Sequence, residues 1–191
     1  MVYLQTDRLQ LEWIRSADLE DLLELDSDPE VMRFLTGGMP HDRQTIASEI
    51  LPKYLSWQSE SSGYGYFVAR LKSTDAFLGW FHLRPKDKEH WLEPELGYRL
   101  LRRYWGCGYA TEGAQALIAK AFLFLGSECV WASTMAVNQA SQRVMVKAGL
   151  HYVRTDFSPW AKPISGSDQG VVFYTIDRRQ WLANRLLVGD H

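Results

Sequence analysis

The most constraining feature of this chain is the segment 103–111, with the sequence RYWGCGYAT. It follows a strand-like run, Glu95 to Leu101, and precedes a strongly helical run, Thr111 to Leu125. The first N–H groups of a helix have no intrahelical partner and lie at the positive end of the helix dipole. A strand, a glycine-spaced turn and a helix start in this order therefore predict a site that binds a phosphate.

The spacing of the two glycines narrows the kind of site. Gly106 and Gly108 permit backbone angles closed to other residues, and Arg103 adds a positive charge suited to phosphate oxygens. A Walker loop requires a lysine that is absent here, and a dinucleotide fingerprint requires a third glycine where Thr111 stands. The remaining alternatives are an Arg-x-x-Gly-x-Gly anion site and a surface turn whose glycines only permit tight geometry.

The longer pattern, ELGY at 95–98 followed by YWGCGYATE at 104–112, resembles the coenzyme A pyrophosphate loop of the GNAT superfamily of N-acetyltransferases, and in particular its RimJ/RimL-like branch. The resemblance implies an α+β (mixed α/β) acyl-coenzyme A N-acyltransferase fold, with a central sheet of about seven strands flanked by helices. It implies that the sheet splays apart after the third meander strand, and that acetyl-coenzyme A binds in the gap. No metal is implied.

The rest of the chain agrees with that order of elements, in a single domain over residues 1–191. Apolar periodicity predicts strands at 9–13, 64–71, 77–83, 91–101, 130–137, 150–154 and 171–176, and helices at 16–26, 29–35, 45–57, 111–125 and 141–148. Pro52 is expected to bend or split its helix. Residues 158–170, rich in Pro, Gly and Ser, are expected to form a long loop.

Composition excludes several classes of protein. The net charge of −2 provides no bulk field that would attract nucleic acid or an anionic membrane. Two cysteines make neither a disulfide framework nor a zinc site, which fits a reducing cytoplasm. No signal-like or membrane-spanning apolar stretch is apparent, so we expect a cytoplasmic protein. We further expect a monomer or a homodimer. Trp80, Trp91 and Trp105 are expected mainly in the core.

The resemblance assigns the cofactor contacts. Main-chain N–H groups near Tyr98 to Leu100 would stabilise the developing oxyanion, an effect worth about 3 kcal/mol. Asn138 would contact the pantetheine arm, although Asn138 and Ser141 also read simply as helix caps. The full expected set is Tyr98, Leu100, Arg103, Trp105, Gly106, Cys107, Gly108, Tyr109, Ala110, Thr111, Asn138 and Ser141.

The catalytic residues are less constrained by the pattern. Glu95 is the first candidate for general base, provided that burial raises its pKa toward working pH. Glu93, His82 and His151 are the alternatives. Many GNAT enzymes have a tyrosine as general acid seven positions after the asparagine, and Met145 occupies that position here. Because a thioether cannot donate a proton, either Ser141 or solvent would protonate the thiolate.

Two functions are therefore consistent with the sequence. The first is an acetyl-coenzyme A-dependent N-acetyltransferase, which transfers acetyl directly to a primary amine on a protein N-terminus or a small molecule. The second is a non-catalytic acyl-coenzyme A-binding sensor or scaffold, which the absence of a tyrosine at Met145 keeps open.

Overall fold

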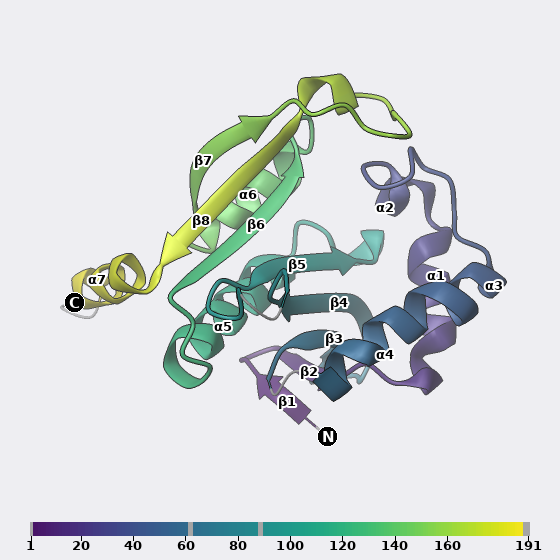
Figure 1. Cartoon of the computed structure of the whole chain (residues 1–191). Coiled ribbons are helices and arrows are strands. Elements are labelled where there is room, and N and C mark those ends of the chain that lie inside the picture. Colours follow the sequence, from purple (N-terminus) through teal and green to yellow (C-terminus); the bar gives the residue numbers. More distant parts are fainter. Residues whose placement is uncertain (1, 61–62, 88–89, 189–191) are drawn as a thin grey trace.

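A computed structural model describes residues 2–60, 63–87 and 90–188 of the chain. Within these residues, eight strands form one mixed sheet in the order β1-β2-β3-β4-β5-β6-β8-β7 (Figure 1). Neighbouring strands are antiparallel except β5 and β6, which are parallel. The strands are β1 Val2–Gln5, β2 Leu9–Trp13, β3 Gly65–Leu71, β4 Phe77–Arg84, β5 Glu95–Leu100, β6 Cys129–Met135, β7 His151–Asp156 and β8 Val171–Asp177.

Helices cover both faces of the first half of the sheet. On one face, α5 packs Leu117 and Phe122 against strand residues such as Phe67. On the other face, α1, α2 and α4 form a second core that includes Leu22 and Tyr54 (Figure 1). The α-helices are α1 Leu19–Ser27, α2 Pro29–Met32, α3 Arg43–Thr45, α4 Leu51–Glu60, α5 Tyr109–Phe124, α6 Gln139–Lys147 and α7 Arg178–Val188.

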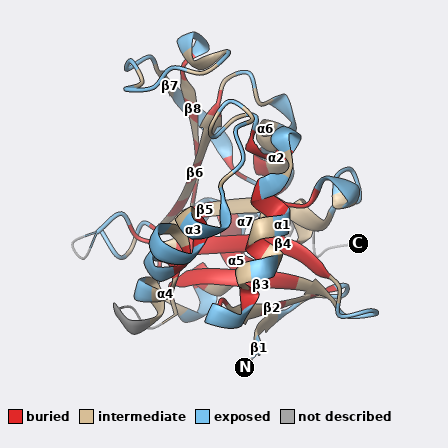
Figure 2. Ribbon diagram, turned by 90° about the vertical axis from the view of Figure 1, so that its right-hand side faces the viewer, coloured by how far each residue is buried: buried red, intermediate tan, exposed pale blue. Residues whose placement is uncertain are grey.

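Burial is concentrated on β3 and β4. Both strands are buried along most of their length because helices cover them on both sides (Figure 2). This explains why both strands appear in the sequence as nearly continuous apolar runs rather than as alternating ones.

The sheet opens between β5 and β6. Their described strand pairing is limited to Glu95 and Trp131, and the Trp131 N–H also donates to the Pro94 carbonyl at 3.1 Å. Both residues lie near the amino ends of their strands, so the strands diverge toward their carboxyl ends, and β6 continues with β8 and β7 as a separate leaf (Figure 1). The mixed α/β class and the splay predicted from the sequence are confirmed.

Several details differ from the predicted elements. The sheet has one strand more than expected because the half-exposed β1, which lacks a clear apolar alternation, pairs with β2. β5 begins at Glu95 rather than at Trp91, since Pro94 has no N–H for a strand ladder. The sequence also did not reveal α7, which buries Trp181 against Phe122 at 5.5 Å between ring centroids. No helix in the described ranges has the length and apolarity needed to cross a bilayer.

Pro52 widens its helix instead of splitting it. A π-helical turn, η2 Ile46–Ile50, connects α3 to α4, and Pro52 is the second residue of α4. The Leu51 N–H bonds to the carbonyl of Ile46, five residues earlier. A proline ring clashes with the carbonyl four residues before it, and the wider turn relieves that conflict.

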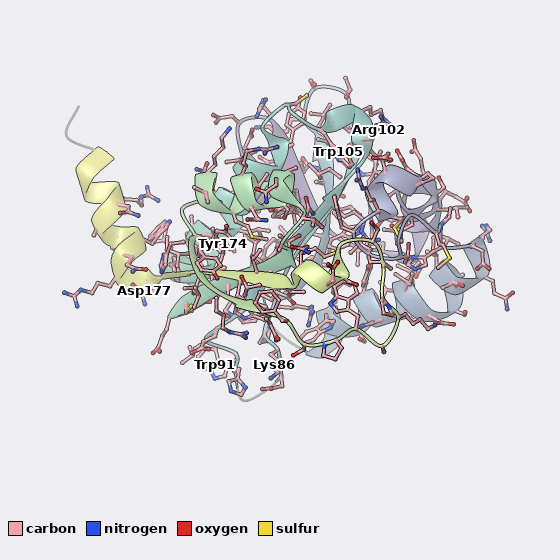
Figure 3. All side chains as sticks on the ribbon, turned by 90° about the horizontal axis from the view of Figure 1, so that it is seen from above. Lys86, Trp91, Arg102, Trp105, Tyr174 and Asp177 are labelled. Atoms are coloured by element: carbon pink, nitrogen blue, oxygen red, sulfur yellow. The ribbon has the colours of Figure 1, made fainter. Side chains whose placement is uncertain are left out.

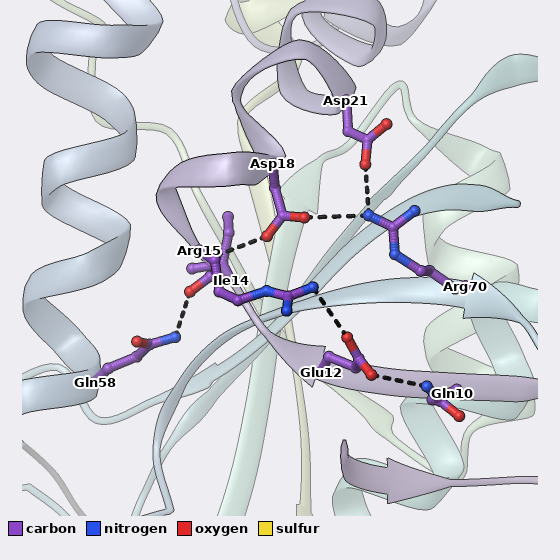
Figure 4. A network of polar contacts seen from close by, with 8 residues as sticks. All are labelled: Gln10, Glu12, Ile14, Arg15, Asp18, Asp21, Gln58 and Arg70. Atoms are coloured by element: carbon purple, nitrogen blue, oxygen red, sulfur yellow. Dashed lines mark hydrogen bonds and ion pairs between the residues drawn. The ribbon is translucent and has the colours of Figure 1, made fainter. Parts of the chain in front are cut away.

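A polar network holds the first helices on the sheet (Figure 4). Arg70 of β3 donates to Asp18 at 3.1 Å and to Asp21 of α1 at 2.7 Å. Asp18 also accepts the N–H of Arg15 at 2.7 Å. From α4, the Gln58 side chain donates to a backbone carbonyl that follows β2, at 2.5 Å. These contacts fix α1 and α4 relative to β2 and β3.

Gly79 allows β4 and β5 to approach closely. Its φ is +144°, and a Cβ there would lie 2.1 Å from the Arg99 carbonyl oxygen. We expect Gly79→Ala to lower the free energy of unfolding by about 3 kcal/mol, because backbone atoms cannot move aside as a flexible side chain can. Urea denaturation followed by circular dichroism measures the change.

Gly126→Ala is the matched control. Gly126 also has a positive φ, +72°, but its Cβ position has no described atom within 4 Å. The free energy of unfolding of this variant should fall by only about 1 kcal/mol, which is the cost of a left-handed backbone at a residue with a Cβ. Equal losses in the two variants would contradict the steric explanation for Gly79.

Candidate functional site

A cavity of about 520 Å³ occupies the region where β5 and β6 diverge. One end is formed by the glycine turn and the start of α5, one wall by α6, and the other end by α2 with β4. The lining residues that matter for its chemistry are Trp80, His82, Glu95, Tyr98, Arg99, Leu100, Trp105, Gly106, Gly108, Tyr109, Ala110, Thr111, Asn138, Ser141, Arg143 and Lys147.

The predicted phosphate-binding turn forms one rim of the cavity. Gly106 and Gly108 have φ values of +75° and +82°, and Gly108 is the N-cap of the 16-residue helix α5. The position of a Gly106 Cβ has no described atom within 4 Å. The Trp105 indole N–H donates to the Leu100 carbonyl at 2.8 Å, which ties the turn to the end of β5. An open main-chain turn at a positive helix end fits a diphosphate group.

Two of the predicted cofactor contacts are not part of the cavity lining. Arg103 Nη1 lies 2.5 Å from Glu24 Oε1 of α1, and both side chains are about half exposed. Cys107 is exposed, and its Sγ contacts the Trp105 carbonyl at 3.6 Å. Arg103 and Cys107 thus lie outside the cavity lining, and their contacts with the cofactor stay predictions.

Arg8 supports the turn and was missed in the sequence. It donates through Nε to Glu112 at 2.6 Å and through Nη1 to the Cys107 carbonyl at 3.0 Å, and its guanidinium lies 4.4 Å from the Tyr109 ring centroid. Arg8 and Cys107 are 99 positions apart, so no local pattern signals this contact.

Three predicted residues meet where α6 begins. Asn138 accepts the Ser141 N–H at 3.1 Å and caps the helix, which therefore starts at Gln139 rather than at Ser141. The Asn138 amide also donates to Thr134 Oγ1 at 3.1 Å. The Tyr98 hydroxyl lies 3.0 Å from Ser141 Oγ. Burial raises the pKa of Tyr98 to about 12, so its hydroxyl remains protonated at neutral pH.

Glu95 lies on the cavity wall at the start of β5. Its Oε2 is 2.7 Å from Arg84 Nη2 and 3.6 Å from His82 Nε2. Burial acts to raise the pKa of Glu95, but its interactions with His82 and Arg84 outweigh burial and bring the pKa below the usual range. The expectation that burial would raise this pKa toward neutrality is wrong, and the carboxylate is ionised at neutral pH.

His82 of β4 completes this end of the cavity. A Cβ at Gly97 would lie 2.3 Å from the imidazole Cε1, so the glycine leaves the space that the ring fills. Neither ring nitrogen has a hydrogen-bond partner among the described residues. Burial lowers the pKa of His82, so the imidazole is neutral at neutral pH. The other alternative bases, Glu93 and His151, do not line the cavity.

The tryptophans have different environments. Trp80 is buried and lines the cavity. Trp91 and Trp105 are 48% and 47% exposed, so the expectation that they lie in the core is wrong. Viewed from above, Trp91 and Trp105 lie at opposite edges of the molecule, and only Trp105 borders the cavity (Figure 3).

Several lining residues were not assigned to the site from the sequence. Val31, Phe34 and Leu35 form an apolar part of the wall at the end of the cavity that Trp80 and Arg99 also line. The long loop 158–170 reaches the same side, because a Cβ at position 37 would lie 3.2 Å from the Ile164 side chain.

Two cations of α6 also line the cavity. Arg143 and Lys147 are four residues apart, so they share one face of the helix. The spacing of four residues on a predicted helix is the sequence feature from which these two cations could have been assigned to one surface. The described residues contain no group of three or more His, Cys, Asp or Glu side chains arranged to hold a metal ion.

Comparison with known proteins identifies the family. A model described as "Acetyltransferase (GNAT) domain" matches residues 8–151. An FsC-acetyl coenzyme A-N(2)-transacetylase from Aspergillus fumigatus is 34% identical over 185 residues, covering 94% of this chain and 77% of that protein.

Two solved structures share the fold. A RimL ribosomal alpha-N-protein acetyltransferase in complex with coenzyme A superposes with a TM-score of 0.78 at 14% identity, covering 93% of this chain and 98% of that one. A spermidine N-acetyltransferase from Vibrio cholerae, in complex with coenzyme A and spermine, has a TM-score of 0.76 at 15% identity, covering 93% and 99%.

The family model spans most of the chain, and the Aspergillus relative exceeds 30% identity over nearly all of it. The fold and the cavity at the splay agree with both findings. The chain belongs to the GNAT acetyltransferase family and is an acetyl-coenzyme A-dependent N-acetyltransferase.

Proposed function

We propose that this enzyme is a single-domain member of the RimJ/RimL-like branch that acetylates a primary amine on a small molecule, by direct transfer while both substrates are bound. The observation that carries the proposal is one cavity with an open phosphate turn at one end and the Glu95–His82 pair at the other. The ELGY and YWGCGYATE patterns support the branch. The name of the Aspergillus relative, an N(2)-transacetylase that uses acetyl-coenzyme A, supports a small-molecule amine.

Cofactor binding is assigned to the rim of the cavity. The main chain of Gly106 and Gly108 and the first-turn N–H groups of Tyr109 to Thr111 would bind the pyrophosphate, with Trp105 holding the turn on β5. The edge of β5 from Tyr98 to Leu100 lacks a neighbouring strand on the cavity side, and its N–H groups would pair with the pantetheine arm and the thioester oxygen. The Asn138 side chain would contribute from α6.

Removal of the amine proton is assigned to the Glu95–His82 pair. Glu95 is ionised and His82 is neutral, so the carboxylate attracts the ammonium group and the imidazole accepts its proton through water. The free amine then forms a C–N bond with the acetyl carbon, the nitrogen loses its second proton to solvent, and the C–S bond breaks with its electron pair remaining on sulfur.

Protonation of the departing sulfur is assigned to Ser141. Met145 cannot supply a proton, so the Ser141 hydroxyl gives its proton to the thiolate and regains one from solvent, and the Tyr98 hydroxyl, 3.0 Å from Ser141 Oγ, holds the serine in position. The demand on this acid is modest, because a thiol has a pKa of about 8.5 and its thiolate is a tolerable leaving group.

The proposal is tested with two measurements. Acetyl-coenzyme A should raise the melting temperature, and ATP and NAD should not, since a ligand at a hundred times its Kd adds about 2.7 kcal/mol of stability. Thiol release should require both acetyl-coenzyme A and a small primary amine. Thermal stabilisation without thiol release from any small amine or N-terminal peptide would contradict the proposal and favour a sensor.

A further inference from the structure

One face of β4 and β5 forms the floor of the acceptor end of the cavity. Cross-strand pairing places Trp80 opposite Arg99, and His82 opposite Gly97. Glu95 stands on the same face as Arg99, because side chains two and four positions apart point the same way from a strand. A cation and a carboxylate thus occupy opposite ends of one row along β5, and both line the cavity.

Arg99 is held in place by buried partners. Its Nη1 lies 2.5 Å from Oδ1 of Asp26, whose side chain is only 3% exposed and also contacts His41 Nδ1 at 2.9 Å. The guanidinium stacks over Trp80 at 5.0 Å from the ring centroid. The hydrogen bonds described for Arg99 use only Nη1. Its Nε and Nη2 therefore remain as donors for a bound molecule.

Trp80 supplies a second unused donor beside Arg99. The residue is 6% exposed, and its indole N–H has no hydrogen-bond partner in the described part of the chain. A buried donor without a partner is costly, so a ligand oxygen that accepts from it gains correspondingly. Unused donors on Arg99 and on the Trp80 ring beneath its guanidinium favour a bound molecule that carries an oxygen.

The charged residues at this end of the cavity bear on whether the acceptor can have a second ammonium group. Glu95 is paired with Arg84, and Asp26 is paired with Arg99, so neither carboxylate is left for a second ammonium group. A polyamine would also place a cation near Arg99. The remaining wall is formed by the apolar Val31, Phe34 and Leu35 and by Glu30, whose carboxylate lies 3.8 Å from Arg33 Nη1.

We propose that Arg99 and Trp80 bind a carbonyl or carboxylate oxygen of the acceptor, next to its amine. The preferred acceptors are then apolar α-amino amides, esters or acids, and not polyamines. This inference rests on the proposed function of the same cavity.

The test compares amines that differ only in this oxygen. Phenylalanine amide, phenylalanine methyl ester, phenylalanine and phenethylamine are assayed by thiol release from acetyl-coenzyme A, with spermidine as the polyamine. Rates are expressed per concentration of unprotonated amine. We expect kcat/KM for at least one carbonyl-bearing acceptor to exceed that for phenethylamine by about 10- to 100-fold, and spermidine to be the poorest substrate.

Variants separate recognition from folding. Arg99→Met is combined with Asp26→Asn so that no buried carboxylate is left unpaired, and Trp80→Phe removes the N–H while keeping a ring. Both should lower kcat/KM for the carbonyl-bearing acceptors about tenfold more than kcat/KM for phenethylamine, which abolishes most of the preference for the carbonyl. Arg154→Met is the control, because Arg154 on β7 also pairs with a carboxylate, Asp156, and stacks on an aromatic ring outside the cavity.

The outcomes separate the oxygen subsite from acetyl transfer itself. An equal kcat/KM for phenethylamine and all carbonyl-bearing acceptors, or an equal loss for both in Trp80→Phe, would overturn the oxygen subsite and leave acetyl transfer intact. Thiol release from none of the amines would overturn the proposed function together with the subsite. If the double variant does not fold, as judged by its acetyl-coenzyme A thermal shift, Trp80→Phe decides the question.

Discussion

Gly106→Val should weaken acetyl-coenzyme A binding by about a thousandfold while leaving the protein folded. The φ of +75° at this position is strained for a β-branched residue, so the turn would shift toward other backbone angles. The added side chain would also stand at the rim, where the diphosphate has to reach the main chain. Isothermal titration calorimetry with acetyl-coenzyme A measures the loss.

Gly126→Val provides an unusually close control. Gly126 is exposed like Gly106, has nearly the same φ, +72°, and also has no described atom within 4 Å of its Cβ position. It lies at the far end of α5 and does not line the cavity. Both variants should lose similar thermal stability, and only Gly106→Val should lose cofactor affinity. Wild-type affinity in Gly106→Val would refute the phosphate turn.

The second large effect concerns the proton acceptor. Glu95→Gln should lower kcat by about a hundred- to a thousandfold, because the carboxylate attracts the ammonium group and supports proton transfer to His82. His82→Gln should cause a loss of similar size. Steady-state kinetics at saturating acetyl-coenzyme A measures both, and Glu128→Gln, an exposed carboxylate outside the cavity, is the control.

The pH dependence separates the roles of the two residues. The pKa of His82 is lowered, so wild-type kcat should fall only as the pH drops through a value below the usual histidine range and the ring becomes protonated. His82→Gln should lose this acid limb. The pKa of Glu95 is also lowered, so Glu95 alone would produce no inflection near neutrality. An unchanged acid limb in His82→Gln would refute His82 as the acceptor of the proton.

The features that were predictable from the sequence depend on neighbours along the chain. The glycine turn, the positive φ at Gly108 and the start of α5 follow from residue types within one short segment. Apolar runs located β3 and β4, and the long pattern around the turn identified the family before any contact was known.

The electrostatic state of the site was decided by residues that are distant in the chain. Arg103 was expected at the phosphate, and the structure pairs it with Glu24 of α1, 79 positions earlier in the chain. Glu95 was expected to have a raised pKa, yet Arg84 and His82 on the neighbouring strand keep it low. Arg99 has its role only because α1 places Asp26 beside it. Backbone angles are local preferences, whereas the charge state of a side chain depends on whichever groups the folded chain places within a few ångströms of it, and no single segment of the sequence contains that information.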